Sequence, residues 1–131
     1  PTHIIDFATL TGSCVVTFGE YVAGMLTNNE TLAKKIFLAG EKTYERVWQL
    51  PLYDEYSDEI KSEIADIKNL GYKDGKYAGA ITGAAFLKRF VKSPWVHLDI
   101  AGTAWYERRR YYIPQSATGF GVRLAIEFLK S

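Results

Sequence analysis

The sequence is poor in the features that would assign it to several protein classes. Its one cysteine, Cys14, can form no disulfide within the chain, and a lone thiol is typical of a reducing compartment such as the cytoplasm. Its 16 basic and 15 acidic residues give a net charge of +1, which argues against a dominant electrostatic partner such as nucleic acid. No apolar run approaches the roughly 20 residues that cross a membrane, so we expect no membrane partner.

The start of the chain also lacks two common features. It begins at Pro1 without an initiator methionine, and it has no basic stretch followed by an apolar one, as a signal peptide would have. We therefore expect residues 1–131 to be a piece of a longer protein. With 131 residues and 47% hydrophobic content, the chain suits one globular domain or part of one.

Short β-rich runs alternate with helical patterns along the chain. This alternation predicts an α/β fold with a mostly parallel sheet, because helices between strands provide the crossovers that parallel pairing needs. Strands are predicted at 3–9, 22–28 and 95–102, helices at 12–18, 30–48, 80–92 and 120–130, a partly helical surface segment at 53–69, and loops at 70–80 and 103–119.

A search for metal ligands finds only two close pairs of histidine and acid, His3 with Asp6 and His97 with Asp99. A zinc site needs three or four converging ligands, and no third ligand stands at a telling spacing. His97 and Asp99, on the same face of a predicted strand, could ligate zinc or pair by a hydrogen bond in the core, and we predict the hydrogen-bonded pair and no metal ligand.

Nucleophile and phosphate motifs are also lacking. "TGSCV" does not match the Gly-x-Ser-x-Gly elbow, so Cys14 is expected to be a small core residue. In "GYKDGKY" the glycines are too close for a phosphate-binding loop, and no Ser or Thr follows Lys76. We predict no catalytic residue in this chain.

The run "WYERRRYY" at 105–112 interleaves arginines with aromatic residues. Such a run can bind nucleic acid through phosphate contacts and base stacking. A solvated loop or a subunit contact is the more ordinary interpretation, since Arg and Tyr are enriched at protein interfaces. The alternative function is thus a non-catalytic module that binds nucleic acid or protein through Arg108, Arg109 and Arg110.

Three edges rich in small residues remain: "ATLTG" at 8–12, "KNLGYKDG" at 68–75 and "IAGTA" at 100–104. Two of them follow predicted strands, and ligands of open α/β sheets bind outside the carboxyl ends of parallel strands. These edges therefore either border a pocket or form ordinary strand-to-helix turns.

Several longer blocks of the sequence form a known pattern. "IIDFATLTGSCVVTFG", "SEIADIKNLG", "WVHLDIAGTAW" and "YIPQSATGFGVRLAIEFL" resemble, in order, blocks of the leucyl aminopeptidases, also called cytosol aminopeptidases. The resemblance implies the C-terminal portion of a single catalytic domain, part of a three-layer αβα sandwich with a mixed, largely parallel sheet. It also implies a hexameric exopeptidase that uses two divalent metal ions, Mn or Zn, to remove N-terminal residues from peptides.

The motifs that carry the metal ligands and catalytic groups of that family precede "IIDFATLTG" and do not occur in this sequence. The resemblance therefore places no catalytic or metal-binding residue in residues 1–131 and implies that the isolated chain is inactive.

What the resemblance does imply is part of a substrate cleft. The residues matched to the pocket for the N-terminal side chain are Thr9, Gly12, Ala101 and Ala104, a mostly small and apolar set that suits hydrophobic side chains. The backbone of Leu10 would face the peptide. Asn69 and Leu70 would border the next subsite.

Overall fold

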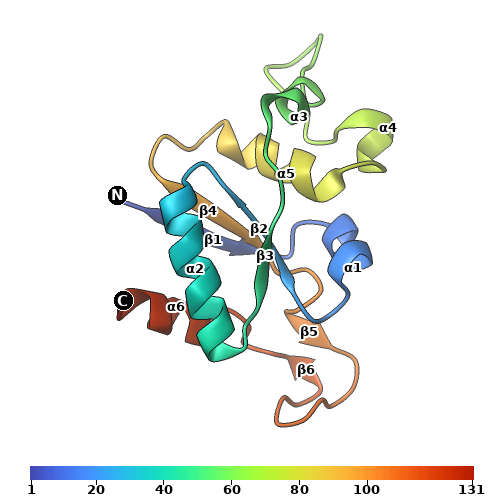
Figure 1. The fold of residues 1–131 in the computed structure, drawn as a ribbon. Helices are drawn as coiled ribbons and strands as arrows, with labels where there is room; N and C mark the ends of the chain where they lie inside the picture. Colours follow the sequence, from blue (N-terminus) through green and yellow to red (C-terminus); the bar gives the residue numbers. More distant parts are fainter.

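The computed structural model describes residues 1–131 and has a four-stranded sheet at its centre (Figure 1). The strand order is β1 (Ile4–Ala8), β4 (Trp95–Asp99), β2 (Ala23–Thr27) and β3 (Val47–Gln49). β1 pairs with β4 and β2 with β3 in parallel, whereas β2 and β4 are antiparallel. The predicted α/β fold with a mixed, mostly parallel sheet is confirmed.

Helices cover both faces of this sheet. α2 (Glu30–Thr43) and α6 (Val122–Leu129) lie together on one side, and α1 (Gly12–Phe18) and α5 (Gly79–Lys88) lie on the other (Figure 1). The sheet is therefore the middle of three layers. The short elements are α3 (Asp54–Asp58), α4 (Tyr72–Gly75) and the antiparallel pair β5 (Trp105–Tyr106) and β6 (Ser116–Ala117).

The strand residues alternate between two hydrophobic clusters, as a buried sheet requires. Val96 and Leu98 of β4 belong to the larger cluster, which α2 and α6 share. Trp95 points to the opposite face and packs with Leu26 and with Ala84 of α5. Because both faces of the sheet are covered, all five residues of β2 and all five of β4 are buried.

The helix predicted at 30–48 is too long by several residues. It begins as expected, because the Asn29 side chain accepts a hydrogen bond from the Leu32 N–H at 2.9 Å. It ends at Thr43, and Tyr44 adopts a left-handed backbone with φ 63°. Val47 then pairs with Ala23 in the sheet and is buried. Pairing with a distant strand outweighed the local helical pattern.

Two segments predicted as loops also hold short regular elements. α4 forms within 70–80, and β5 and β6 form within 103–119. All three elements are short, and their sequences carry no periodicity long enough to indicate them.

Glu45 joins the end of α2 to the start of α6. Its side chain is buried, and its carboxylate accepts the N–H groups of Gly121 at 3.0 Å and Leu124 at 2.8 Å. The Arg123 guanidinium donates to it at 3.1 Å. Glu45 thus satisfies N–H groups at the start of α6 that have no other side-chain cap.

Gly40 allows the close approach that this junction needs. A β-carbon at Gly40 would lie 2.8 Å from the Glu45 carbonyl oxygen. The sequence places a glycine inside a helix at a cost of about 1 kcal/mol relative to alanine, which indicated close packing there. The structure confirms that packing.

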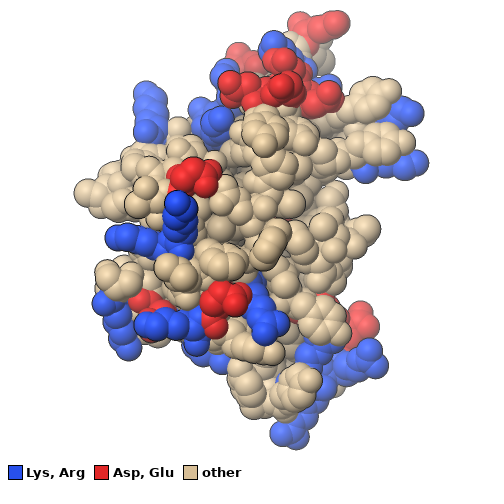
Figure 2. All heavy atoms as spheres, viewed as in Figure 1, with Lys and Arg blue, Asp and Glu red and all other residues tan.

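Two further features concern the surface. No helix of the structure has both the length and the apolar character needed to cross a membrane. Basic and acidic side chains are both spread over the visible face, with acidic side chains gathered near α3 (Figure 2). This mixture agrees with the near-neutral net charge.

Replacing Glu45 with Ala should destabilise the fold. The change leaves the Gly121 and Leu124 N–H groups buried without an acceptor, so we expect the free energy of unfolding to fall by about 2–4 kcal/mol. Urea denaturation followed by circular dichroism measures the effect. Glu63→Ala, at an exposed position, is the control and should change stability by less than about 0.5 kcal/mol. Equal stability of the two variants would contradict the role of Glu45.

Candidate functional site

A single buried carboxylate holds the turns that follow β1 and β4. Asp99 is fully buried at the end of β4, and its Oδ1 accepts the N–H groups of Leu10 at 3.2 Å and Ala101 at 3.1 Å. Its Oδ2 accepts the Thr11 hydroxyl at 2.7 Å. Because β1 and β4 are parallel neighbours, their carboxyl ends lie side by side. The structure therefore brings two of the three small-residue edges together.

The third edge, at 68–75, meets the turn after β1 at a cavity of about 230 Å³, which we call the first cavity. Leu10, Gly12, Asn69 and Leu70, four of the residues assigned from the resemblance, line it. The cavity lies between the turn after β1, the segment that contains α4, and α5. The sequence analysis did not assign other residues that line it: Thr11, Ser13, Asp74, Gly75, Gly79, Thr82 and Gly83.

The remaining assigned residues, Thr9, Ala101 and Ala104, lie outside the lining of this cavity. Thr9 is exposed beside Leu10, and Ala101 is linked to Leu10 through Asp99. Ala104 is tied back to the same turn, since its N–H donates to the Ile100 carbonyl at 2.9 Å. These three residues border the edge at the ends of β1 and β4 rather than the cavity itself.

Two glycines let α5 lie against the turn after β1. A β-carbon at Gly83 would lie 3.1 Å from Leu10 Cδ2, and one at Gly79 would lie 2.3 Å from Ser13 Oγ. Neither position has space for a larger side chain without movement of its neighbour. Gly83, within the helix predicted at 80–92, was the one sequence signal for this wall of the cavity, because a helical glycine indicates close packing. Gly79 fell in the segment predicted as a loop.

The segment before α5 follows an unusual backbone path. Lys73, Asp74 and Ala78 have positive φ angles of 47°, 55° and 50°, a conformation that residues with side chains adopt rarely. Gly75 lies between them with φ 76°. Repeated left-handed residues curl this segment tightly, so Asp74 and Gly75 line the first cavity beside Leu70.

The histidine and acid pairs differ from those predicted. His97 and Asp99 share a face of β4, but His97 Nδ1 lies 2.6 Å from Asp6 Oδ1 on the neighbouring strand. Asp6 Oδ2 accepts the Trp95 indole N–H at 2.6 Å. The β1–β4 register, which sets Asp6 opposite His97, explains the change of partner. Hydrogen bonding of His97 to a carboxylate is confirmed, whereas its predicted pairing with Asp99 is wrong.

The chain does not fit a metal centre. It has no group of three or more His, Cys, Asp or Glu side chains placed to hold an ion. The Asp99 carboxylate already accepts three hydrogen bonds, and Asp6 accepts from Trp95 and is paired with His97. Asp6, His97 and Asp99, three of the four residues considered from the sequence as possible ligands, are therefore engaged in hydrogen bonds within the fold.

Cys14 behaves as a small core residue, as predicted. Its side chain is buried, and the thiol donates to the Asp99 carbonyl oxygen at 3.4 Å. Burial, together with the nearby Asp99 charge, raises the pKa of the Cys14 thiol from 9.0 to about 11. The thiol is neutral at physiological pH and is a poor nucleophile.

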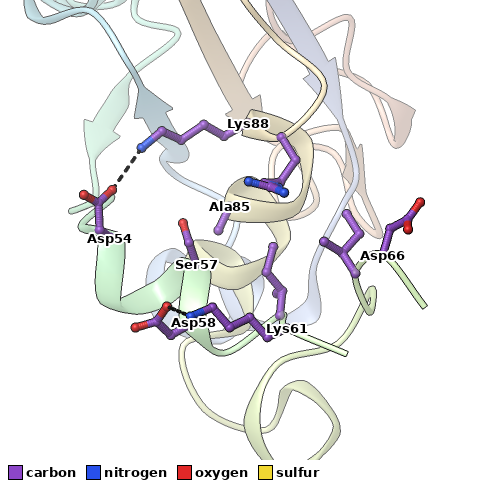
Figure 3. Close-up of a pocket in the computed structure, with 10 residues that line it drawn as sticks. Asp54, Ser57, Asp58, Lys61, Asp66, Ala85 and Lys88 are labelled. Carbon is purple, nitrogen blue, oxygen red and sulfur yellow. Dashed lines mark ion pairs between the residues drawn. The ribbon is translucent and has the colours of Figure 1, made fainter. Parts of the chain in front are cut away.

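A hollow of about 450 Å³ that is lined by both acidic and basic side chains lies elsewhere, between α3 and α5 (Figure 3). Its charges are partly matched within the chain, since Asp58 pairs with Lys61 at 2.7 Å and Asp54 with Lys88 at 3.7 Å. None of the residues assigned from the sequence lines it. This hollow is not the candidate site.

The arginine run does not form one continuous basic surface. Arg110 pairs with Glu20 at 3.2 Å, donates to the Tyr21 hydroxyl at 3.1 Å and lies over the Tyr21 ring. Arg108 and Arg109 are exposed. Only two of the three arginines are therefore presented to an outside partner, which weakens the alternative function as a nucleic-acid module.

Comparison with known proteins identifies close relatives. A family model described as the catalytic domain of the cytosol aminopeptidase family matches residues 1–126. A probable cytosol aminopeptidase of Geobacter sulfurreducens is 54% identical over 100% of this chain, and the match covers 26% of that relative. One of Cenarchaeum symbiosum is 55% identical over 99% of this chain, and the match covers 27% of that relative. One of Chlorobaculum tepidum is 50% identical over 99% of the chain and 25% of its own length. The chain spans about a quarter of these relatives.

Replacing Asp99 with Asn should loosen both turns. The amide retains one acceptor oxygen and places its NH₂ group among donors, so we expect the free energy of unfolding to fall by about 2–4 kcal/mol. Amide NMR shifts of Leu10 and Ala101 should move together. The control, Asp66→Asn at an exposed position, should leave both unchanged. Shifts in only one turn would contradict a shared anchor.

Cys14 should resist alkylation in the folded chain. With a pKa of about 11 in the fold against 9.0 for a free thiol, the thiolate fraction at pH 8 is about a hundredfold lower, and burial slows reaction further. Because the folded pKa is the higher one, this group's contribution to stability should be lost as pH rises from 9 towards 11. Iodoacetamide labelling with and without urea tests the first point. Rapid labelling without urea would contradict it.

Proposed function

The chain belongs to the cytosol aminopeptidase family, and from this premise we propose that it forms one side of the substrate cleft of an aminopeptidase. The reaction is the removal of N-terminal residues, preferably hydrophobic ones, from peptides. The observation that carries the proposal is the first cavity, where Leu10, Gly12, Asn69 and Leu70 lie beside the turns held by Asp99.

The roles proposed for these residues are the ones that the family resemblance implies. Thr9, Gly12, Ala101 and Ala104 form the wall for the N-terminal side chain, and their small size leaves room for an apolar group. Burying such a group contributes roughly 25 cal/mol per Å². Asn69 and Leu70 border the place of the second residue. The Leu10 N–H already donates a hydrogen bond to Asp99. The Leu10 carbonyl oxygen is therefore the backbone group that we assign to accept a hydrogen bond from the peptide.

The chemistry itself belongs to groups outside residues 1–131. The side chains of this segment form no metal-holding cluster, and the Cys14 thiol is neutral and buried. Two divalent ions, Mn or Zn, and the residues that hold them would come from other segments of the catalytic domain, of which residues 1–131 form the C-terminal portion. This chain would then orient the peptide and shield its apolar end from water.

The proposed setting is the cytoplasm, in a homo-oligomer such as a hexamer. The name of the relatives, probable cytosol aminopeptidase, supports this compartment. The assembly rests on the resemblance. Exposed apolar side chains on α6, Val122, Ile126 and Leu129, are consistent with a surface that further protein covers.

Peptide binding to the 131-residue chain tests the proposal. In an NMR titration with Leu-Gly, the amides of Leu10, Gly12 and Leu70 should shift, and Leu70→Ala should weaken binding several-fold because the subsite loses apolar contact. The chain should not hydrolyse Leu-p-nitroanilide with added Mn²⁺ or Zn²⁺.

Leu129→Ala is the matched control, because Leu129 is exposed on α6, away from the first cavity. It should leave peptide binding unchanged. Two results would contradict the proposal: shifts confined to the region of Arg108 and Arg109, or turnover by the isolated chain at a rate typical of an enzyme.

A further inference from the structure

A second cavity of about 390 Å³ adjoins the first one. The two share Ser13, Gly75 and Gly79 in their linings. Ser13 and Gly79 touch, since a β-carbon on Gly79 would lie 2.3 Å from Ser13 Oγ. The two cavities therefore lie on either side of one narrow wall. A bound peptide that extends beyond the first cavity would reach the second.

The second cavity differs in chemistry from the first. Its lining includes the apolar side chains of Val16, Leu50 and Ile81, and Val16 on α1 is 88% exposed. Lys76 is its only charged residue, whereas Asp74 is the only charged residue of the first cavity. An anionic group is therefore favoured in the second cavity and disfavoured in the first.

The Lys76 charge is not compensated within the chain. The ion pairs of the chain do not include Lys76. Lys73, three residues earlier, lies over the rings of Tyr72 and Tyr77 instead. Lys76 thus combines an unpaired ammonium group with a neighbouring apolar hollow.

We propose that the second cavity binds the third residue of a short peptide, with its C-terminal carboxylate paired to Lys76. The inference rests on the proposed function, which places the first two residues at the first cavity and its edge. An extended peptide advances about 3.3 Å per residue, so successive side chains reach neighbouring hollows. One cation beside apolar side chains suits a single carboxylate, whereas phosphate sites gather several donors.

The test compares Leu-Gly-Leu with its C-terminal amide. Titrations of the 131-residue chain, followed by NMR, should show the free acid binding about two- to fivefold more tightly, as expected for one exposed ion pair. The amides of Val16 and Thr17 should shift with the tripeptide and not with Leu-Gly.

Lys76→Met removes the charge and keeps an unbranched side chain. In this variant the acid and the amide should bind equally. Lys34→Met is the matched control, because Lys34 is an exposed lysine on α2, outside both cavities, and the preference for the acid should persist there. The comparison of the acid with the amide in the unmutated chain tests the inference even if a variant fails to fold.

The outcomes separate this inference from the proposed function. Equal binding of acid and amide, with shifts retained at Leu10 and Leu70, would overturn the inference and leave the proposed function intact. Absence of shifts at both cavities would overturn both. Shifts at Val16 with inorganic phosphate but not with the tripeptide would also overturn the assignment of a peptide carboxylate.

Discussion

The candidate site depends on the buried carboxylate of Asp99. It ends the central strand β4 and accepts hydrogen bonds from Leu10, Thr11 and Ala101. A buried carboxylate is stable only when its oxygens are satisfied, so the two turns and the carboxylate hold one another in place. The same residue's carbonyl accepts the Cys14 thiol, which fixes α1 against the sheet. Asp99 therefore organises the site without being exposed to a ligand.

Close backbone approach supplies the second constraint. Gly79 and Gly83 let α5 contact the turn after β1, and their lack of side chains defines a wall of the first cavity. The opposite wall follows the left-handed backbone of Lys73, Asp74 and Gly75. The cavity is thus shaped by backbone geometry and small residues, with Asp74 as its one charged side chain.

The division of labour that we propose within the larger protein is consistent with these contacts. The carboxylates of Asp6 and Asp99 already accept hydrogen bonds inside the fold, and the thiol of Cys14 is neutral. The chain spans about a quarter of the length of its relatives, and we assign the catalytic groups to the rest of the protein. The first cavity bears Asp74 and the adjoining second cavity bears Lys76. This difference in charge agrees with the proposed binding mode, in which the C-terminal carboxylate of the peptide lies at the second cavity.

The sequence by itself determined the α/β alternation, the start of α2 at Asn29, the close packing at Gly40 and the family resemblance, because each depends on neighbouring residues or ordered blocks. It also indicated that the edges after β1 and β4 belong together. Only the tertiary structure decided that Val47 joins the sheet, that His97 faces Asp6, and that Gly83 meets Leu10. Strand register and helix approach set these contacts between residues far apart in the chain, and no local pattern records them.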